Sequence, residues 1–102
     1  MGKEIRLTAP TLKVIGALML RPRGELSGAE IAVSTKLFSG TLYPILVRLE
    51  GAGWLESRWE SEDPALLGRP RRRYYRVTAE GARNVRKAVK DLQPTFGRLA
   101  WS

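Results

Sequence analysis

The hydrophobic period of this chain changes once and then changes back, and this change restricts the fold more than any other feature. Apolar residues recur at helical spacing as far as Gly53, alternate with polar residues in two segments between Trp54 and Val77, and return to helical spacing after Thr78. A period of about 3.6 is typical of an amphipathic helix, and a period of about two is typical of a half-buried strand. The sequence therefore predicts helices, then a pair of strands, then a final helix.

Two helices are predicted in the first third of the chain. Thr8–Pro10 is typical of a helix start, because proline is tolerated in the first turn, and Pro22 is expected to end this helix. Ser27 and Glu30 have the spacing of a capping box, in which each side chain accepts a hydrogen bond from the backbone amide of the other residue. They predict a short second helix that ends near Thr35.

A third helix is predicted to begin at Ser39, its expected N-cap, and to end at Gly51 and Gly53. Its buried face is apolar and consists of Leu42, Ile45, Leu46 and Leu49. Its opposite face has few side chains that form hydrogen bonds and consists of Gly40, Pro44, Val47, Arg48 and Gly51. Lys36–Phe38 is the expected turn between the second and third helices.

Two strands are predicted after the third helix. Trp54–Glu60 alternates between apolar and polar residues, and Arg72–Val77 is the returning strand. The connection between them, Ser61–Arg71, is long for a hairpin and contains two prolines and a glycine. We therefore expect a mobile loop at the end of the hairpin.

The final helix is expected to begin after Thr78, its N-cap, and to end at Pro94. The order of elements is then helix, helix, helix, hairpin, helix. This mainly α fold with a small β-hairpin (α+β) is a winged helix-turn-helix. We expect one DNA-binding domain over residues 1–93, followed over residues 94–102 by a short C-terminal tail that is a candidate dimer contact.

Positive charge is concentrated in one segment of the chain. The 102 residues include 18 lysines and arginines and 10 aspartates and glutamates, which gives a net charge of +8. Five of the eight residues from Arg69 to Arg76 are arginine. A GC-rich genome would raise the arginine content but would not cluster it. The cluster therefore indicates a polyanionic partner, of which double-stranded DNA is the leading candidate.

Several classes of function are excluded by residues that the sequence lacks. It contains no cysteine and no histidine, so disulfides, zinc-finger sites, thiol nucleophiles and histidine-based catalysis are excluded. The carboxylates between Glu56 and Asp63 have no glycine-rich phosphate loop nearby, so we expect no enzyme, cofactor or metal site. The longest apolar run, Leu12–Leu20, is too short to span a bilayer, and we expect a cytoplasmic protein.

The start of the third helix is the first candidate site. The free amides and partial positive charge of a helix N-terminus favour a phosphate near Ser39, Gly40 and Thr41. Tyr43 either donates its hydroxyl to a phosphate or a base, or is a half-buried packing residue. Arg48 either donates two hydrogen bonds to a guanine edge, or is solvated or ion-paired. With few base-reading groups on this face, we expect specificity to use groove shape and half-site spacing as well.

The arginines of the hairpin are the second candidate site. Arg69 and Arg71 flank Pro70 near the tip and are the expected DNA contacts, because arginine suits a narrow minor groove and bidentate phosphate contacts. The other arginines of the cluster lie on the returning strand and are Arg72, Arg73 and Arg76. For most of these we expect cross-strand ion pairs, for which the partners are Glu56, Glu60 and Glu62.

The hairpin carries four aromatic side chains, two tryptophans on its first strand and two tyrosines on its returning strand. Trp54 and Trp59 are expected to pack where the first strand meets the helices. Tyr74 and Tyr75 are neighbours on a strand and point to opposite faces, so one of them is expected in the core.

Several segments together resemble the PadR-like family of bacterial transcriptional regulators. They lie within about residues 8–92 and are Ser27–Ile31, Ser39–Pro44, Leu46–Glu50, Gly53–Leu55, Gly68–Arg76 and Thr78–Gly81. The resemblance implies a dimeric repressor whose third helix enters the major groove and whose wing meets the DNA backbone or the minor groove. The residues expected to contact DNA are Lys36, Ser39, Gly40, Thr41, Tyr43, Arg48, Arg69, Arg71 and Arg72.

The resemblance also bears on the dimer and on ligands. Many relatives dimerise through a long C-terminal region, whereas little of this chain follows Pro94. The expected dimer surface combines the first helix with the C-terminal residues and consists of Leu12, Ile15, Val89, Leu92, Phe96, Leu99 and Trp101. A ligand, where the family has one, would be a small aromatic effector, a planar compound bound between protomers.

The sequence departs from the family pattern at two further places. Ala29 stands where the family usually has an aromatic residue, and the wing carries Ala65–Leu67 where polar residues are expected. A second class of function also competes with DNA recognition, since a winged helix can use the same basic face to bind an acidic protein or RNA. Such an interaction module would show no preference among DNA sequences, and its affinity would nearly vanish by about 0.2 M salt.

Overall fold

The computed structural model describes residues 5–21 and 24–101, with side chains as far as Asp91. The helices are α1 (Ala9–Met19), α2 (Gly28–Thr35), α3 (Ser39–Gly51), α4 (Pro64–Leu67) and α5 (Ala79–Trp101). The strands are β1 (Glu25–Ser27), β2 (Leu55–Trp59) and β3 (Arg73–Val77). This is the predicted order of helices and hairpin, with one additional strand and one additional helical turn, and it is a winged helix-turn-helix.

The first two helices begin at the predicted caps. The Thr8 hydroxyl accepts a hydrogen bond from the Thr11 amide, and Pro10 occupies the first turn of α1. At α2 the Ser27 hydroxyl accepts from the Glu30 amide at 3.1 Å, while the Glu30 carboxylate accepts from the Ser27 amide at 2.9 Å. The bond from the Ser27 amide lowers the pKa of Glu30. Both capping predictions are confirmed.

The start of α3 differs from the prediction by one residue. Phe38 is the N-cap, and its side chain makes no capping hydrogen bond, so the expectation that Ser39 caps this helix is wrong. The Phe38 carbonyl accepts hydrogen bonds from the amides of Thr41 and Leu42, both at 2.9 Å. The helix therefore includes Ser39 as its first residue, and the turn from α2 bends at Lys36, whose φ of 60° is left-handed.

The sheet contains three antiparallel strands in the order β1-β3-β2. β2 and β3 form the predicted hairpin, with Ser57 opposite Tyr75 and Leu55 opposite Val77. β1 pairs with the other edge of β3 and places Leu26 opposite Tyr75. β1 was not predicted, because a three-residue strand with one apolar side chain carries too little alternation to be recognised.

The core lies between the sheet and the first three helices. Its buried apolar side chains are Val14, Ile15, Leu18, Leu26, Ile31, Leu42, Ile45, Leu46, Leu49, Leu55, Tyr75 and Val85. The predicted buried face of the third helix is confirmed in full. Tyr75 is the tyrosine of the hairpin that enters the core, whereas Tyr74 on the other face is half-buried.

The last helix begins as predicted but does not end as predicted. The Thr78 hydroxyl accepts from the Gly81 amide at 2.9 Å and donates to the Gly53 carbonyl at 2.6 Å. α5 then continues through Pro94 to Trp101, so the expected helix end at Pro94 is wrong, and residues 94–101 extend the helix. An interior proline removes one helical hydrogen bond and strains the preceding turn, but the apolar period of the sequence continues beyond it through Phe96 and Leu99.

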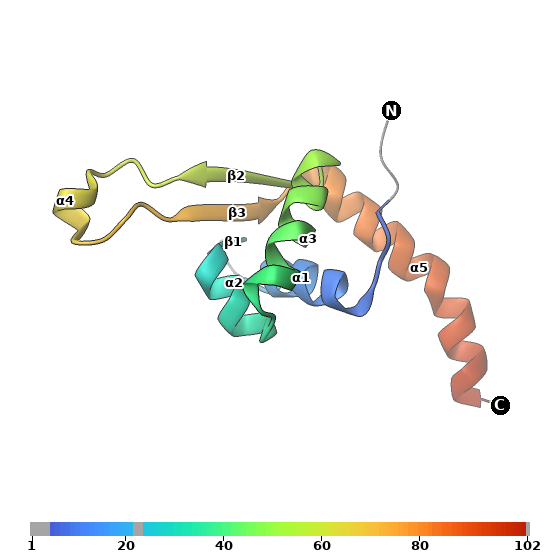
Figure 1. Cartoon of the computed structure of the whole chain (residues 1–102). Coiled ribbons are helices and arrows are strands. Elements are labelled where there is room, and N and C mark those ends of the chain that lie inside the picture. The colour runs from blue at the N-terminus through green and yellow to red at the C-terminus, as the bar shows by residue number, and fades with distance from the viewer. Residues whose placement is uncertain (1–4, 22–23, 102) are drawn as a thin grey trace.

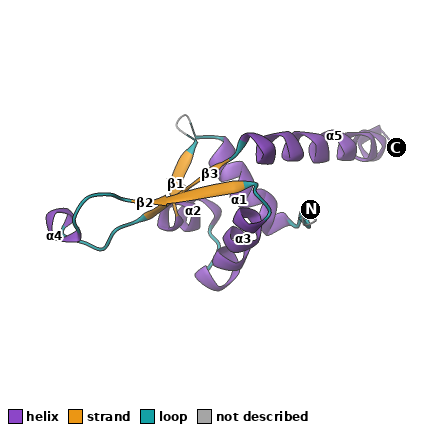
Figure 2. Cartoon of the chain, turned by 90° about the horizontal axis from the view of Figure 1, so that it is seen from above, coloured by secondary structure: helices purple, strands orange, loops and turns teal. Residues whose placement is uncertain are grey.

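Two arms leave the body of the molecule in opposite directions (Figures 1 and 2). One arm is the wing, defined here as residues 55–77, and α4 forms its tip. The other arm is the C-terminal part of α5. The molecule measures 59 × 31 × 27 Å along its principal axes. Within the described residues, no helix is both long and apolar enough to cross a membrane.

The connection at the end of the wing contains a capped helical turn, which the sequence analysis did not predict. Asp63 accepts a hydrogen bond from the Ala65 amide at 2.9 Å and Pro64 is the first residue of α4. Gly68 ends the turn with a φ of 68°, a left-handed conformation that favours glycine. Leu66, at the outer end, is 82% exposed.

Candidate nucleic-acid interface

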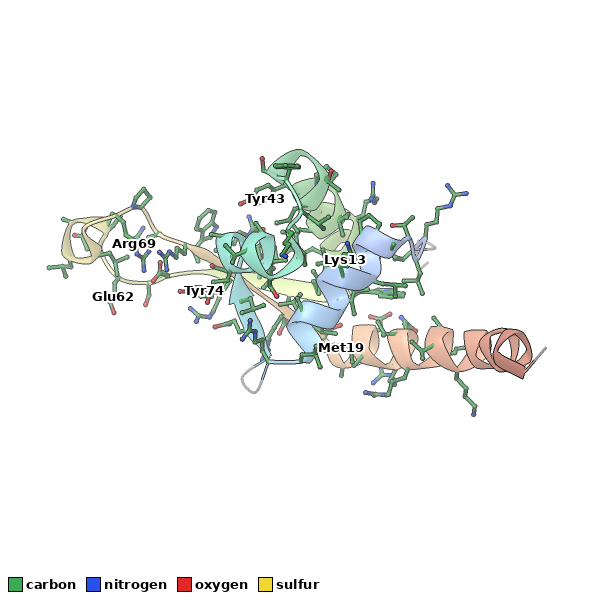
Figure 3. The ribbon with its side chains drawn as sticks, turned by 90° about the horizontal axis from the view of Figure 1, so that it is seen from below. Lys13, Met19, Tyr43, Glu62, Arg69 and Tyr74 are labelled. Atoms are coloured by element: carbon green, nitrogen blue, oxygen red, sulfur yellow. The ribbon has the colours of Figure 1, made fainter. Side chains whose placement is uncertain are left out.

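The second and third helices and the wing enclose one groove. The groove has a volume of about 470 Å³. The end of β1 contributes Ser27, and α2 contributes Gly28 and Ala29. α3 contributes Tyr43 and Val47, and the wing contributes Trp59, Arg71, Arg72, Arg73 and Tyr75. The exposed face of α3 and the arginines of the wing therefore border a single concave surface. Figure 3 shows Tyr43 on α3 and Arg69 further out along the wing.

Tyr43 lies over the start of α2. A Cβ atom at Gly28 would be 3.0 Å from the Tyr43 hydroxyl and 3.4 Å from its ring, so the absence of a side chain at Gly28 makes room for the tyrosine. Tyr43 remains 47% exposed. Tyr43 is therefore a packing residue on α2 that stays partly exposed, and its contact with a phosphate or a base stays a prediction.

The first turn of α3 offers two amides rather than three. The Thr41 amide donates to the Phe38 carbonyl, and is thus already satisfied. The amides of Ser39 and Gly40 have no partner among the described residues. An added Cβ at Gly40 would meet nothing within 4 Å, so this end of the helix is open to close approach by a ligand.

Two basic side chains flank the exposed face of α3. Arg48 is exposed and has no carboxylate partner within the described part of the chain. The ion pair is therefore not formed in the described structure, and a guanine contact or a solvated guanidinium remains for Arg48. Lys36 is exposed in the turn that precedes α3. Both cations are available to a polyanion that approaches α3.

The outer arginines of the wing differ in whether they are paired. Arg69 donates to both carboxylate oxygens of Glu60, at 2.6 and 3.0 Å, so its guanidinium is ion-paired. Its expected contact with DNA stays a prediction. Arg71 donates its Nε to the Glu62 carbonyl at 2.9 Å. Arg72 is exposed, and its guanidinium has no carboxylate partner in the described structure. The available cations of the wing are thus Arg71 and Arg72.

The inner arginines of the wing hold it to the rest of the domain. Arg76 pairs with Glu56 across the hairpin, as predicted. Arg73 instead donates to the Ser57 hydroxyl at 2.8 Å and to Glu50 at 3.4 Å, while Ser57 donates to Glu50 at 2.6 Å. Because Glu50 belongs to the last turn of α3, this network fixes the wing relative to the helix.

Glu60 should keep its negative charge to low pH. The two hydrogen bonds from Arg69, with a further one from the Arg72 amide at 2.7 Å, lower the pKa of Glu60 from 4.5 to about 2. Its carboxylate therefore stabilises the wing above about pH 4.5 and loses this effect as the pH falls towards 2. We expect an NMR titration of the Glu60 side chain to give a midpoint near pH 2, and Arg69→Gln to raise it. An equal midpoint in both proteins would contradict the pair.

The exposure of two aromatic residues, Trp59 in the groove and Phe38 before α3, was not predicted from the sequence. Trp59 is 58% exposed, and the Arg73 guanidinium lies 5.4 Å from its ring centre, so the expectation that Trp59 packs against the helices is wrong. The end of β2 extends past the core, and its inward face is left open there. Phe38, next to the first turn of α3, is 86% exposed. No periodic signal marks a residue in a turn, so its exposure was not predictable.

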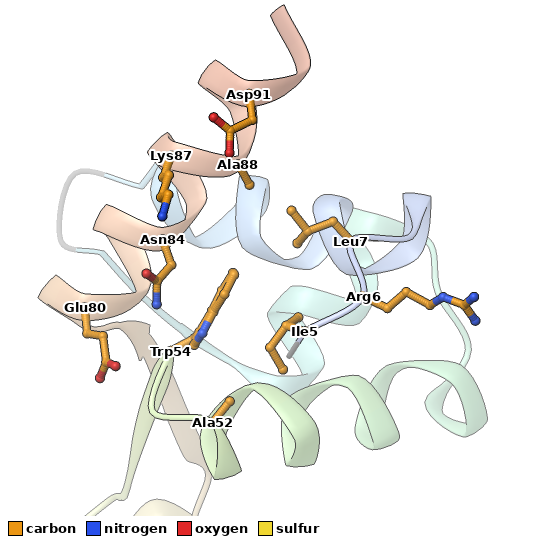
Figure 4. Close-up of a pocket in the computed structure, with 10 residues that line it drawn as sticks. All are labelled: Ile5, Arg6, Leu7, Ala52, Trp54, Glu80, Asn84, Lys87, Ala88 and Asp91. Atoms are coloured by element: carbon orange, nitrogen blue, oxygen red, sulfur yellow. The ribbon is translucent and has the colours of Figure 1, made fainter. Parts of the chain in front are cut away.

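A second cleft lies where α5 joins the domain (Figure 4). It has a volume of about 640 Å³ and contains Ile5, Arg6, Leu7, Ala52, Trp54, Glu80, Asn84, Lys87, Ala88 and Asp91. Trp54 stands between the N-terminal segment and α5 and packs against the core, as predicted. This cleft is separate from the groove at α3, with which it shares no residue.

The residues expected at a dimer surface fall into three groups. Ile15 is only 2% exposed and belongs to the core of its own chain, so its assignment to a dimer surface is corrected. Leu12 is half-buried, and Val89 on α5 is 46% exposed. The remaining residues have side chains outside the described part of the structure and are Leu92, Phe96, Leu99 and Trp101.

Solved structures of bacterial regulators share this fold. A PadR family transcription regulator from Clostridium difficile R20291 matches with a TM-score of 0.73 and 21% identity, over 92% of this chain and 97% of its own. BpsR of Bordetella bronchiseptica, described with regulation of its DNA binding by 6-hydroxynicotinic acid, matches with a TM-score of 0.63 and 21% identity, over 94% of this chain and 64% of its own. Bacillus subtilis PadR in complex with operator DNA matches with a TM-score of 0.62 and 21% identity, over 80% of this chain and 48% of its own.

Sequence comparison assigns the chain to a family. No protein with a curated description is significantly similar to it. A family profile, that of the transcriptional regulator PadR-like family, matches residues 19–87. The matched region contains α2, α3, all three strands and the first part of α5, and hence the whole groove described above. Members of this family regulate transcription and are not enzymes, and the chain belongs to the PadR-like family of transcriptional regulators.

Proposed function

We propose that the protein is a sequence-specific DNA-binding repressor that acts as a homodimer. In this proposal α3 enters the major groove, and the wing lies along the DNA backbone or the adjacent minor groove. The observation that carries the proposal is the shared groove, in which the exposed face of α3 and the free arginines of the wing face the same space. A duplex that contacts α3 would meet Arg71 and Arg72 at the same time.

The unpaired groups divide into those that hold phosphate and those that read bases. The amides of Ser39 and Gly40 point out of a helix N-terminus, where partial positive charge favours a phosphate. Arg71 and Arg72 supply the wing's contacts to the backbone, and Arg69 keeps the wing in shape through Glu60. In this proposal Arg48 reaches a base edge, because it is an exposed cation on α3 itself.

Arg48 and Arg71 should have different effects on specific and random DNA. We expect Arg48→Ala to weaken operator binding by about 1–3 kcal/mol and to change binding to random duplex little. Arg71→Ala should weaken both and reduce the dependence of log K on log salt by about one. Arg86→Ala is the control, because it removes one positive charge from an exposed position on α5 and not from the groove. Fluorescence anisotropy over a salt series measures each effect. An equal loss on both duplexes for Arg48→Ala would make it a phosphate contact.

The proposed function is tested by isolating the preferred DNA sequence. Selection from a random duplex library gives the operator, and anisotropy compares it with a scrambled duplex at about 0.15 M salt. A preference of about 10³ or more, with two protomers per duplex, would support the proposal. The bound protein should then lower transcription from a promoter that contains the operator. Equal and weak binding to both duplexes would favour the protein- or RNA-interaction module instead.

We also place the small aromatic effector in the cleft of Figure 4. Trp54 supplies a flat aromatic wall there, and Asn84 and Lys87 lie beside it with polar groups (Figure 4). A planar aromatic acid would stack on the indole and place its carboxylate near Lys87. We expect a panel of hydroxylated aromatic acids to include one that binds the protein and releases the operator. Lys87→Ala should lower its affinity by about tenfold, as expected for a charged hydrogen bond. A panel without any binding member would contradict this placement.

A further inference from the structure

The face of α3 that would meet DNA is largely apolar. Phe38 is 86% exposed at the N-terminal end of the helix, and Val47 is 69% exposed on its outer face. Between and beyond them lie Gly40, Pro44 and Gly51, which have no side-chain donor or acceptor. Apart from Arg48, the side chains of this face make few hydrogen bonds with bases, so much of its contribution to base recognition has to come from apolar contact.

The charges around this face indicate what covers it. Lys36 and Arg48 flank the helix, and Arg71 and Arg72 stand on the opposite side of the groove. An apolar surface bordered by unpaired cations is poorly suited to another apolar protein surface, because the cations would lose their hydration. A DNA duplex satisfies both parts, since its phosphates pair with the cations and its major groove displays methyl groups between them.

We propose that the protein recognises thymine through its 5-methyl group, with Phe38 as the principal contact and Val47 as the second. This inference rests on the proposed function and specifies what the same site reads. The thymine methyl is the apolar group that a base pair presents in the major groove, and phenylalanine is among the side chains that contact it. Residues at the N-terminal end of a recognition helix commonly reach base edges, and Phe38 is the N-cap of α3.

The spacing of the two side chains limits where the thymines lie. Phe38 and Val47 are nine residues apart, which corresponds to about 13.5 Å along a helix axis. At a rise of about 3.4 Å per base pair, this length spans no more than about four base pairs. Each operator half-site should therefore contain two thymine positions, on either strand, that lie within about four base pairs of each other.

Deoxyuridine tests the proposal, because it has every hydrogen-bonding group of thymidine and lacks only the methyl group. Each thymine of the selected operator is replaced singly by uracil, and affinity is measured by anisotropy. We expect a loss of about fourfold at the two contacted positions, which is about 0.8 kcal/mol for one buried methyl group. At the remaining positions the affinity should not change.

Variants then assign each methyl group to its side chain. In Phe38→Ala the loss at one of the two positions should disappear while the loss at the other persists, and in Val47→Ala the pattern should be reversed. Both residues are exposed, so both variants should fold. Leu20→Ala is the control. Leu20 lies at the end of α1 and is 85% exposed, about as much as Phe38, and this variant should retain both losses.

The possible outcomes separate this inference from the function on which it rests. If the selected operator binds tightly and every uracil-containing duplex binds equally well, methyl recognition is wrong and the DNA-binding function stands. If the losses occur but are the same in Phe38→Ala and Val47→Ala, the methyl groups act through DNA shape and the assignment of both residues is overturned. If no preferred sequence can be selected, the proposed function itself fails.

Discussion

Replacing Gly81 with alanine should destabilise the protein by about 3 kcal/mol. Gly81 lies in the first turn of α5, where an added Cβ would be 2.2 Å from the Trp54 carbonyl oxygen and 2.8 Å from its Cα. These are backbone atoms and cannot rotate away as a side chain could. The same carbonyl accepts a hydrogen bond from the Thr78 amide at 2.9 Å, so a shift of either segment would also weaken the start of α5.

Urea unfolding at a fixed protein concentration measures this loss, because the stability of a protein that dimerises depends on concentration. The melting temperature should fall by about 4–8 °C for each kcal/mol. Gly16→Ala is the matched control: this glycine is also helical, and its added Cβ would meet nothing within 4 Å. The control should be as stable as the wild type or gain up to about 1 kcal/mol. Wild-type stability in Gly81→Ala would show that α5 does not approach Trp54 as closely as described.

The parts of the fold that depend on neighbouring residues were predictable from the sequence. The capping box of Ser27 and Glu30 and the cap at Thr78 are formed by residues three apart, so a short pattern contains all of the information. β1 was missed because its pairing partner is β3, some fifty residues further along the chain, and its own three residues have no distinctive period. The cap of α3 was misplaced because Phe38 caps with its backbone alone, which no side-chain preference reveals.

The sequence predicts which residue types make up the candidate site. It does not predict which arginines form ion pairs with carboxylates. The arginine cluster lies in the predicted hairpin, but composition does not say which guanidinium forms an ion pair. Arg69 pairs with Glu60 because the bend of the wing around α4 brings together residues nine apart. Arg73 pairs with Glu50 because β3 passes the end of α3. These contacts follow from the tertiary structure, and so does the assignment of Arg71 and Arg72 as the available cations.

The apolar stripe of α5 should hold the proposed dimer together. Its residues follow one another at alternating spacings of four and three, and are Val85, Val89, Leu92, Phe96 and Leu99. Val85 is buried in the core of its own chain, whereas Val89 is 46% exposed. The C-terminal part of α5 leaves the body of the molecule (Figure 2). A helix with such a stripe normally buries it against another element. A second copy of α5 offers a matching stripe, and this would join two α3 helices in one particle.

Val89→Glu with Leu92→Glu should therefore produce a folded monomer, because two carboxylates in an apolar interface cannot be buried without partners. Sedimentation measures the mass, and circular dichroism checks that the fold is retained. Loss of the second α3 should weaken operator binding by about 10²-fold or more, since the two half-sites no longer bind as one unit. Arg86→Gln with Lys90→Gln lowers the net charge by the same two units on the same helix and should leave the dimer intact. A Val89→Glu/Leu92→Glu variant that remains dimeric would move the interface elsewhere, with α1 around Leu12 as the next surface to test.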